Sequence, residues 1–421
     1  MKLSNLKNTY KIIMMAAYAC AKWDYEVSQT IVKDRRRLVI VVIMVFLPLV
    51  LTPVFAADLP VVLGGKKAYA PAFSTNEVFL GSIFIGLIAG LITGCIGAGG
   101  GFIITPALMS LGVRGILAVG TDQFHIFAKS IMGTVIHKKL GNVCVPLAIA
   151  FCAGSLIGAT AGGSINRAIY YANPILSDTF ISIIYVLLLG SLGIFAFRDF
   201  LSLRKRIASF DGGNPEHIVG TTKLALKLQS VYIPPMVKFD EDLYPSGKRI
   251  SAWFVAGCGF VVGFMAAIMG VGGGFLTFPM YVYMLGVSSF TTVGTDIFQI
   301  IITAGYSSIF QYAIYGFVFY TLAMGLLLGS LIGIQIGSLV TKVVKGLYIR
   351  GFYATVILAG FVNRLFALPD KLYAAGIIVI DKALCKFLNL AGIVIFFAIV
   401  IVFAAWVLWV FFANMNTLRE V

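Results

Sequence analysis

The chain has 421 residues, of which 60% are hydrophobic and 12% charged, and its formal net charge is +15 at pH 7. A soluble domain keeps about a quarter of its residues charged because its surface faces water, so this composition excludes a soluble protein and indicates a membrane protein. Nucleic-acid binding is disfavoured, because the basic residues lie in short clusters between apolar runs, as the positive-inside rule predicts.

The N-terminal segment, residues 1–37, is polar and basic, and an apolar run over residues 38–57 follows. This run is long enough to span a bilayer. Its basic flank predicts that the N-terminus is cytoplasmic. A cleaved signal peptide is the alternative, but the long preceding region and the length of the run favour an uncleaved transmembrane anchor.

Two groups of apolar segments follow, over residues 78–198 and 251–368, and each is expected to form transmembrane helices. The linker between them, residues 199–250, is basic and contains proline-rich turns, so we expect a cytoplasmic loop. A receptor or scaffold function, or a cytoplasmic partner, would depend on this linker. Residues 369–421 are expected to form an interfacial segment, over about 369–389, and a C-terminal transmembrane helix.

The two groups are copies of one unit, because three motifs recur in both in the same order. The motifs are the glycine-rich segments 97–102 and 270–275, the Val-Gly-Thr-Asp segments 119–122 and 293–296, and the Gly-Ser-Leu-Ile-Gly segments 154–158 and 329–333.

The length of residues 78–112 predicts how each repeat is threaded. As one helix they would measure about 52 Å at 1.5 Å per residue, which is too long for a core of about 30 Å. We therefore expect the glycine-rich segment to divide the stretch into two antiparallel arms, followed by three crossings. Because each repeat crosses the membrane an odd number of times, the two repeats are expected to run in opposite directions. The predicted fold is therefore an all-α polytopic membrane protein with two inverted-topology repeats, glycine-broken helices and extra N- and C-terminal helices.

Each glycine-rich segment breaks a helix in mid-membrane, where every unsatisfied backbone group costs several kcal/mol. Such a break must line a protected cavity, and its N–H groups with the following half-helix would bind an anion. Close helix packing through small residues is the alternative. The glycines expected to contact substrate are Gly97, Gly99, Gly100, Gly101, Gly270, Gly272, Gly273 and Gly274.

A polar helix face follows each break. It carries Asp122, His125 and Lys129 in the first repeat and Asp296, Gln299 and Thr303 in the second, at positions i, i+3 and i+7. Ionisable groups inside a membrane are costly enough to suggest function. We expect Thr121, Lys129, Thr295 and Gln299 to contact an anionic substrate, and Asp122, His125 and Asp296 to exchange protons.

Structural roles compete with each of these assignments. Asp122 and Lys129 would form a structural pair, or each aspartate would accept from nearby backbone N–H groups, and Thr121 and Thr295 would cap a helix. The six cysteines and three histidines show no metal-ligand spacing, so neither a metal nor a cofactor is expected.

The paired Gly-x-Gly-Gly-Gly-Phe segments, each followed by proline and then by Val-Gly-Thr-Asp, resemble the TauE/SafE family of sulfite exporters. The resemblance covers about residues 78–165 and 251–345. It implies a secondary transporter in the inner membrane that moves sulfite, sulfoacetate or another small anion, coupled to an ion gradient. The linker and the N-terminal segment extend beyond the minimal family pattern.

An anion permease working by alternating access is the function that these features favour, with the repeats rocking around a site between the two breaks. An anion channel with duplicated re-entrant segments is the alternative. A membrane enzyme is disfavoured because no catalytic cluster can be assembled from three histidines. The expected partners are a small anion and the lipid bilayer, and a homo-oligomer is compatible with the sequence.

Overall fold

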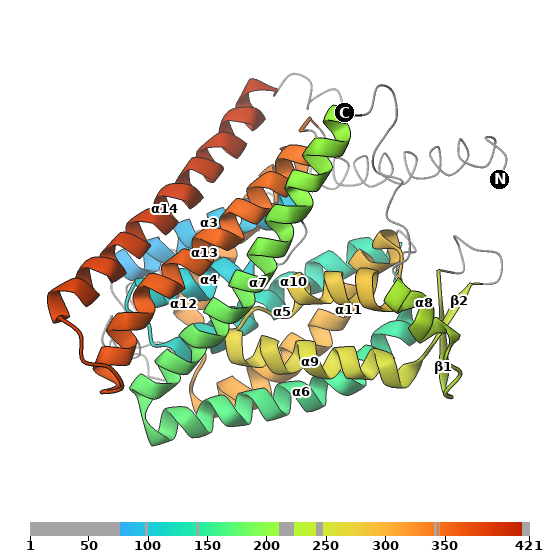
Figure 1. The fold of residues 1–421 in the computed structure, drawn as a ribbon, viewed down its shortest axis with the longest axis horizontal. Helices are drawn as coiled ribbons and strands as arrows, with labels where there is room; N and C mark the ends of the chain where they lie inside the picture. Colours follow the sequence, from blue (N-terminus) through green and yellow to red (C-terminus); the bar gives the residue numbers. More distant parts are fainter. Residues whose placement is uncertain are drawn as a thin grey trace, which may run out of the picture.

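The structure is a computed structural model that describes residues 76–96, 100–139, 143–209, 223–240, 247–340, 343–344 and 346–414. Within these residues, eight helices are long and apolar enough to cross a membrane, and two short strands form the only sheet. The chain is therefore an all-α polytopic membrane protein (Figure 1). The predicted segment 1–37 and anchor 38–57 lie outside the described residues.

The first repeat contains five helices. They are α3 (Asn76–Ile96), α4 (Gly101–Ser110), α5 (Gly115–Lys139), α6 (Val145–Ala172) and α7 (Pro174–Ser209). Of these, α4 is too short to be among the eight apolar spans, and α5 is not among them either. The helix α5 carries the polar face of Asp122, His125 and Lys129, which lowers its hydropathy.

The second repeat follows the same plan with more irregular helices. Its elements are α9 (Ala252–Met269), α10 (Gly274–Pro279), the π-helix η3 (Met280–Leu285), α11 (Ser289–Tyr306), the π-helix η4 (Ser307–Tyr312), the 3₁₀-helix η5 (Ala313–Tyr315), α12 (Tyr320–Val340) and α13 (Gly346–Ala374). A further helix, α14 (Lys382–Ala413), packs against α13 outside both repeats, and α13 packs against α7. Figure 1 shows these three long helices side by side.

Both predicted breaks lie where the glycines occur. Gly100 (φ 70°) directly precedes the half-helix α4, and its equivalent Gly273 (φ 92°) directly precedes α10. Glycine adopts this left-handed conformation without the steric cost that a Cβ would bring. The sequence motif therefore marks the point where each half-helix begins.

The two repeats interlock through two parallel helix pairs, α3 with α12 and α6 with α9. When α10 with η3, and α11 with η4 and η5, are each counted as one element, each pair joins the first helix of one repeat to the fourth element of the other. Glycines line both contacts: Gly325, Gly329, Gly333 and Gly337 of α12 meet successive turns of α3, and Gly154, Gly158 and Gly162 of α6 meet successive turns of α9. Small residues at this spacing let helix backbones approach closely in a membrane.

The two broken-helix hairpins open at opposite ends of the molecule. In the second repeat, α9 begins at the linker and η3 returns to it, where the Leu285 carbonyl accepts from Gln229 of the linker at 2.7 Å. In the first repeat, α4 returns to the end where α6 meets α7, and the Gly115 N–H donates to Asp178 at 2.7 Å. This arrangement is the one that inverted repeats require, and their orientation in the membrane stays a prediction.

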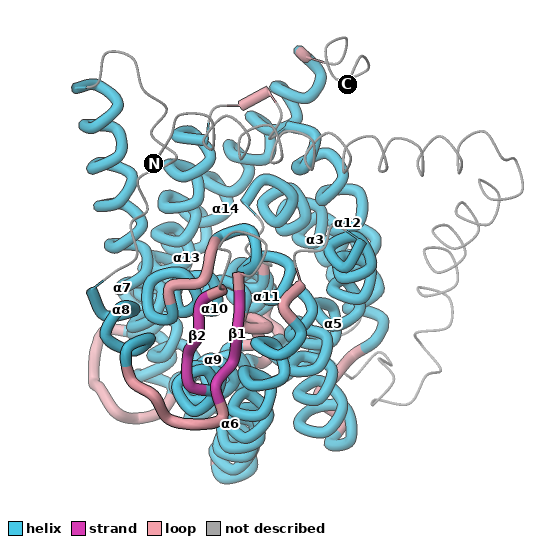
Figure 2. Tube along the Cα trace, turned by 90° about the vertical axis from the view of Figure 1, so that its right-hand side faces the viewer, coloured by secondary structure: helices cyan, strands magenta, loops and turns pink. Residues whose placement is uncertain are grey.

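The described part of the linker contains regular secondary structure. The helix α7 continues to Ser209, past the predicted end of the first group at residue 198. The helix α8 (Lys223–Ser230) follows, and the strands β1 (Met236–Phe239) and β2 (Lys248–Ser251) form an antiparallel hairpin. Figure 2 shows both strands lying over one end of the helices.

Residues 369–389, where the sequence predicts an interfacial segment, form no helix of their own, and their position relative to a bilayer stays a prediction. They hold the end of α13, a turn and the start of α14. The charged residues that suggested an interfacial segment have local partners: Lys371 lies 3.4 Å from Asp178, and Asp381 caps α14 by accepting from the Ala383 N–H at 3.2 Å. Gly376, at φ 72°, forms the turn between them.

The glycine contacts predict a position-dependent effect of adding one methyl group to α9. A Cβ at Gly259 would collide with the Phe151 carbonyl, whereas a Cβ at Gly257 would meet nothing within 4 Å. We expect Gly259→Ala to destabilise the protein by about 1–3 kcal/mol, the usual cost of overpacking. Thermal unfolding of the purified protein in detergent measures this. Gly257→Ala is the matched control, and equal effects of the two variants would contradict the packing argument.

Candidate functional site

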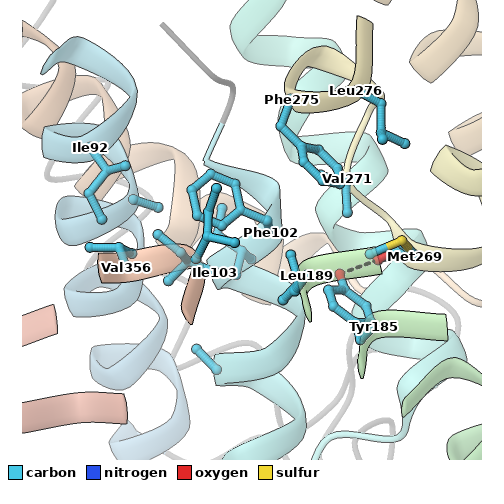
Figure 3. Packing of buried hydrophobic residues seen from close by; sticks show 14 of the residues in the cluster. Ile92, Phe102, Ile103, Tyr185, Leu189, Met269, Val271, Phe275, Leu276 and Val356 are labelled. Carbon is cyan, nitrogen blue, oxygen red and sulfur yellow. Dashed lines mark hydrogen bonds between the residues drawn. The ribbon is translucent and has the colours of Figure 1, made fainter. Parts of the chain in front are cut away.

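The two breaks meet in the centre of the protein. A Cβ added at Gly101 would lie 2.9 Å from Cα of Val271, so the two glycine segments are in backbone contact. The equivalent rings of Phe102 and Phe275 lie side by side there, with centroids 5.9 Å apart (Figure 3). Of the predicted substrate-contacting glycines, Gly97 and Gly99 lie outside the described residues. The close approach of Val271 leaves no room for a Cβ at Gly101, so helix packing is sufficient to explain a glycine at this position.

The other glycines of the second break are also closely surrounded. A Cβ at Gly270 would lie 2.7 Å from Cα of Val119, and one at Gly272 would lie 2.5 Å from Cγ2 of Ile126. Gly274 is buried at the start of α10. The helix α5 therefore packs directly against the second break, while its Asp122 contacts Thr105 of the first half-helix α4.

Side chains from several helices satisfy the carbonyls at the end of α9. Gln123 Nε2 donates to the Ala266 carbonyl at 2.6 Å, the Tyr185 hydroxyl donates to the Met269 carbonyl at 2.5 Å, and the Tyr312 hydroxyl donates to the Ala267 carbonyl. Figure 3 shows the Tyr185 bond below the break. The two tyrosines take the place of helical donors at Met269 and Ala267, as a membrane interior requires, whereas the Ala266 carbonyl keeps its helical bond from the Gly270 N–H and accepts a second one from Gln123.

The first repeat contributes a buried charged face. Asp122 Oδ2 accepts from the Thr105 hydroxyl at 3.0 Å, and Asp122 Oδ1 lies 3.6 Å from Nδ1 of His125. His125 Nε2 pairs with the Ser330 hydroxyl at 2.8 Å. Among the described residues, neither Asp122 Oδ1 nor His125 Nδ1 has a hydrogen-bond partner. Buried polar atoms without partners are costly, which favours a role for this pair beyond structure.

Lys129 lies at the first break. Its ammonium group donates to the Thr93 hydroxyl at 3.3 Å, and a Cβ at Gly100 would lie 2.7 Å from the same hydroxyl. The side chain is 9% exposed, so a cation is held inside a membrane-spanning region. Such groups mark substrate pathways more often than structural positions.

The second repeat contributes a chain of hydrogen bonds at the equivalent place, in which Asp296 is the one ionisable member. Asp296 Oδ1 accepts from Gln299 Nε2 at 2.9 Å, and Gln299 Oε1 accepts from the Thr303 hydroxyl at 2.9 Å. Thr303 in turn pairs with the Ser155 hydroxyl at 2.7 Å. The two faces therefore match in position and differ in charge.

Sequence reasoning missed Ser155 and Ser330. They are the second residues of the two identical Gly-Ser-Leu-Ile-Gly segments, and each reaches the polar face of the other repeat. Their unchanged recurrence was the available signal, but the partners are 148 and 205 residues away in sequence. A single sequence does not reveal contacts over such separations.

Thr121 and Thr295 cap helices of the opposite repeat. The Thr295 hydroxyl accepts from the Cys144 N–H, at the start of α6, at 3.0 Å. The Thr121 hydroxyl accepts from the Phe319 N–H, just before α12, at 3.4 Å. The capping alternative thus describes their contacts, although the helices are not the ones that contain them.

Arg364 is a buried cation that the sequence interpretation also missed. Its guanidinium donates to the Pro106 carbonyl at 3.2 Å, the Ser110 hydroxyl at 3.0 Å and Asn363 Oδ1 at 2.8 Å. It therefore holds the C-terminal end of α4, where a positive charge is favourable. An arginine within the apolar segment 347–368 was the available signal.

Among the described residues, no group of three His, Cys, Asp or Glu side chains lies close enough together to hold a metal ion.

Comparison with known proteins places these features in a family context. A family model described as "Sulfite exporter TauE/SafE" matches residues 82–364, which include both breaks and both polar faces. Two curated Bacillus subtilis proteins are similar. "Probable membrane transporter protein YjnA" is 26% identical over a match that covers 61% of this chain and 87% of the relative. "Probable membrane transporter protein YunE" is 24% identical over a match that covers 62% of this chain and 87% of the relative. A Xylella fastidiosa "Probable membrane transporter protein" is 23% identical over a match that covers 63% of this chain and 85% of the relative. No solved structure matches significantly.

The capping contacts predict that Thr295 stabilises the fold without contacting substrate. We expect Thr295→Val to lower the free energy of unfolding by about 1 kcal/mol, the usual value of a helix cap, and Thr295→Ser to restore it. Thermal unfolding in detergent measures this, with the exposed Thr355→Val as control. A raised KM for transport at unchanged stability would instead assign Thr295 to substrate binding.

Proposed function

This chain belongs to the sulfite exporter TauE/SafE family and is a multi-pass membrane transporter, and we propose that it moves sulfite or an organosulfonate such as sulfoacetate. The proposed mechanism is secondary transport by alternating access in the cell inner membrane, with a cytoplasmic N-terminus and no enzymatic step. The observation that carries the proposal is the pair of buried polar faces beside the two meeting breaks.

Charge supports an anionic substrate. The first repeat places the Lys129 ammonium beside Thr93 and Gly100, within reach of the first break. The second repeat places the neutral groups Gln299 and Thr303 at the equivalent positions. An anion between the faces would bind the cation on one side and hydrogen-bond donors on the other.

Proton coupling is proposed for the acidic groups of the same faces. Asp122 and His125 lie 3.6 Å apart with an unpartnered atom each, so a proton on either one would complete a hydrogen bond between them. Asp296 accepts from the neutral amide of Gln299. A change of protonation at these sites would alter the charge that the anion meets, which is how a proton gradient can drive anion movement.

The packing refines which parts move. The pairs α3 with α12 and α6 with α9 hold backbones of different repeats in contact. Rocking of one intact repeat against the other would break both contacts. We therefore propose that each interlocked pair moves as one body around the breaks.

Removing the charge of Lys129 tests the anion site. We expect Lys129→Gln to reduce uptake of radiolabelled sulfite into proteoliposomes about tenfold or more, because a charge-assisted hydrogen bond contributes about 1.5–3 kcal/mol. Lys227→Gln, on the exposed face of α8, is the matched control and should transport normally. No flux of any sulfur oxyanion through the wild-type protein would refute the substrate.

Removing the carboxylate of Asp296 tests the coupling. We expect Asp296→Asn to retain binding of labelled sulfite but to lose the acceleration that an imposed pH gradient gives the wild type, because the amide cannot take up a proton. Uptake is measured with and without the gradient. Unchanged transport and unchanged pH dependence would favour a channel without coupling carboxylates.

A further inference from the structure

The linker makes a set of hydrogen bonds with one short loop of the second repeat. This loop, residues 286–288, joins the half-helix α10 and η3 to α11, the helix that carries Asp296. It is therefore the connection between the second break and the second polar face.

Three linker side chains bind this loop and the residue before it. Gln229 Nε2 donates to the Leu285 carbonyl at 2.7 Å, and Lys248 Nζ donates to the Gly286 carbonyl at 3.1 Å. Asp240 accepts from the Ser288 N–H at 2.9 Å and from its hydroxyl at 2.7 Å. The bonds reach both sides of the turn at Gly286.

The charges of these side chains suit the helix ends that they contact. Lys248 lies at the C-terminal end of η3, where the helix dipole favours a cation. Asp240 lies at the N-terminal end of α11, where the dipole favours an anion, and it binds the capping residue Ser288. Both helix ends are thus held by the same hairpin.

The linker hairpin is built to hold these side chains in place. Phe239 and Ile250 are buried, and β2 runs directly into α9, whose first turn is capped by Ser251. Asp240 is itself 5% exposed and adopts a positive φ of 56°, a strained conformation for a residue other than glycine. The surrounding contacts must therefore stabilise this conformation.

The first repeat holds its equivalent loop in another way. The contacts there come from membrane-spanning helices: Asp178 of α7 accepts from the Gly115 N–H at 2.7 Å, and Arg364 of α13 binds the end of α4. The second repeat uses an element inserted between the repeats. The hairpin and α8 therefore hold the loop of the second repeat, whereas α7 and α13 hold the equivalent loop of the first.

From these contacts we propose that the linker is a clamp on the second half-helix, and that Asp240 and Lys248 are positioning residues for transport. These two side chains hold the loop 286–288 in place, and the loop in turn fixes the distance between the second break and Asp296. The transport readout rests on the proposed function, whereas the position of the half-helix can be measured without it.

Hydrogen–deuterium exchange of the purified full chain tests the clamp directly. We expect Asp240→Ala and Lys248→Met to speed exchange in residues 280–292 about fivefold, the factor that corresponds to losing one helix cap. Exchange in residues 101–115 should stay as in the wild type. Lys238→Met removes the same charge from the exposed face of β1 and is the matched control.

Transport supplies the second measurement. In proteoliposomes we expect both variants to lower the maximal rate of sulfite uptake with an unchanged KM, and Asp240→Asn, which keeps one acceptor oxygen, to lie between Asp240→Ala and the wild type. Unchanged exchange in residues 280–292, or equal acceleration in both loops, would overturn the clamp. Absence of sulfite flux in the wild type would refute the proposed substrate and leave the exchange test intact.

Discussion

Backbone groups that lose their helical partners inside a membrane must find others, and the centre of this protein is organised around that requirement. At the second break the carbonyls of α9 accept from Gln123, Tyr185 and Tyr312, which come from three different elements. At the starts of α6 and α12 the N–H groups of Cys144 and Phe319 donate to Thr295 and Thr121. Almost all of these bonds join one repeat to the other, so satisfying the breaks also holds the two halves together.

The same symmetry leaves room for a difference in chemistry. Asp122 and Asp296 occupy equivalent places, yet one faces a histidine and a lysine on its helix and the other faces a glutamine and a threonine. Duplication supplies two copies of the scaffold, and each copy can then take on separate side chains. A substrate bound between them, as proposed, would meet the Lys129 ammonium on one side and the uncharged groups of Gln299 and Thr303 on the other.

The sequence predicted what depends on local chemistry. Helix breaks follow from glycine, and Gly100 and Gly273 lie at the start of the half-helices. The polar face on α5 follows from helical spacing, and its members lie together. Duplication followed from motifs that can be compared directly.

The sequence did not predict what depends on distant partners. The contact of Ser155 with Thr303, the capping of α12 by Thr121 and the clamp of Asp240 on Ser288 join segments that only the fold brings together. The charges within 369–389 favoured an interfacial segment, and the sequence did not show that Lys371 lies beside Asp178 or that Asp381 caps α14. Charged residues occur both at helix ends and at membrane surfaces, so their presence in the sequence does not distinguish the two roles.

The interlocked pairs bear on how such a chain could have arisen. Within one repeat, the first helix and the fourth element each pack on a helix of the other repeat. A single ancestral copy would therefore have exposed glycine-lined faces to lipid until it met a second copy running through the membrane in the opposite direction. Fusion of such an antiparallel homodimer requires a connecting segment, and the stretch that now joins the halves is the one that carries Asp240 and Lys248.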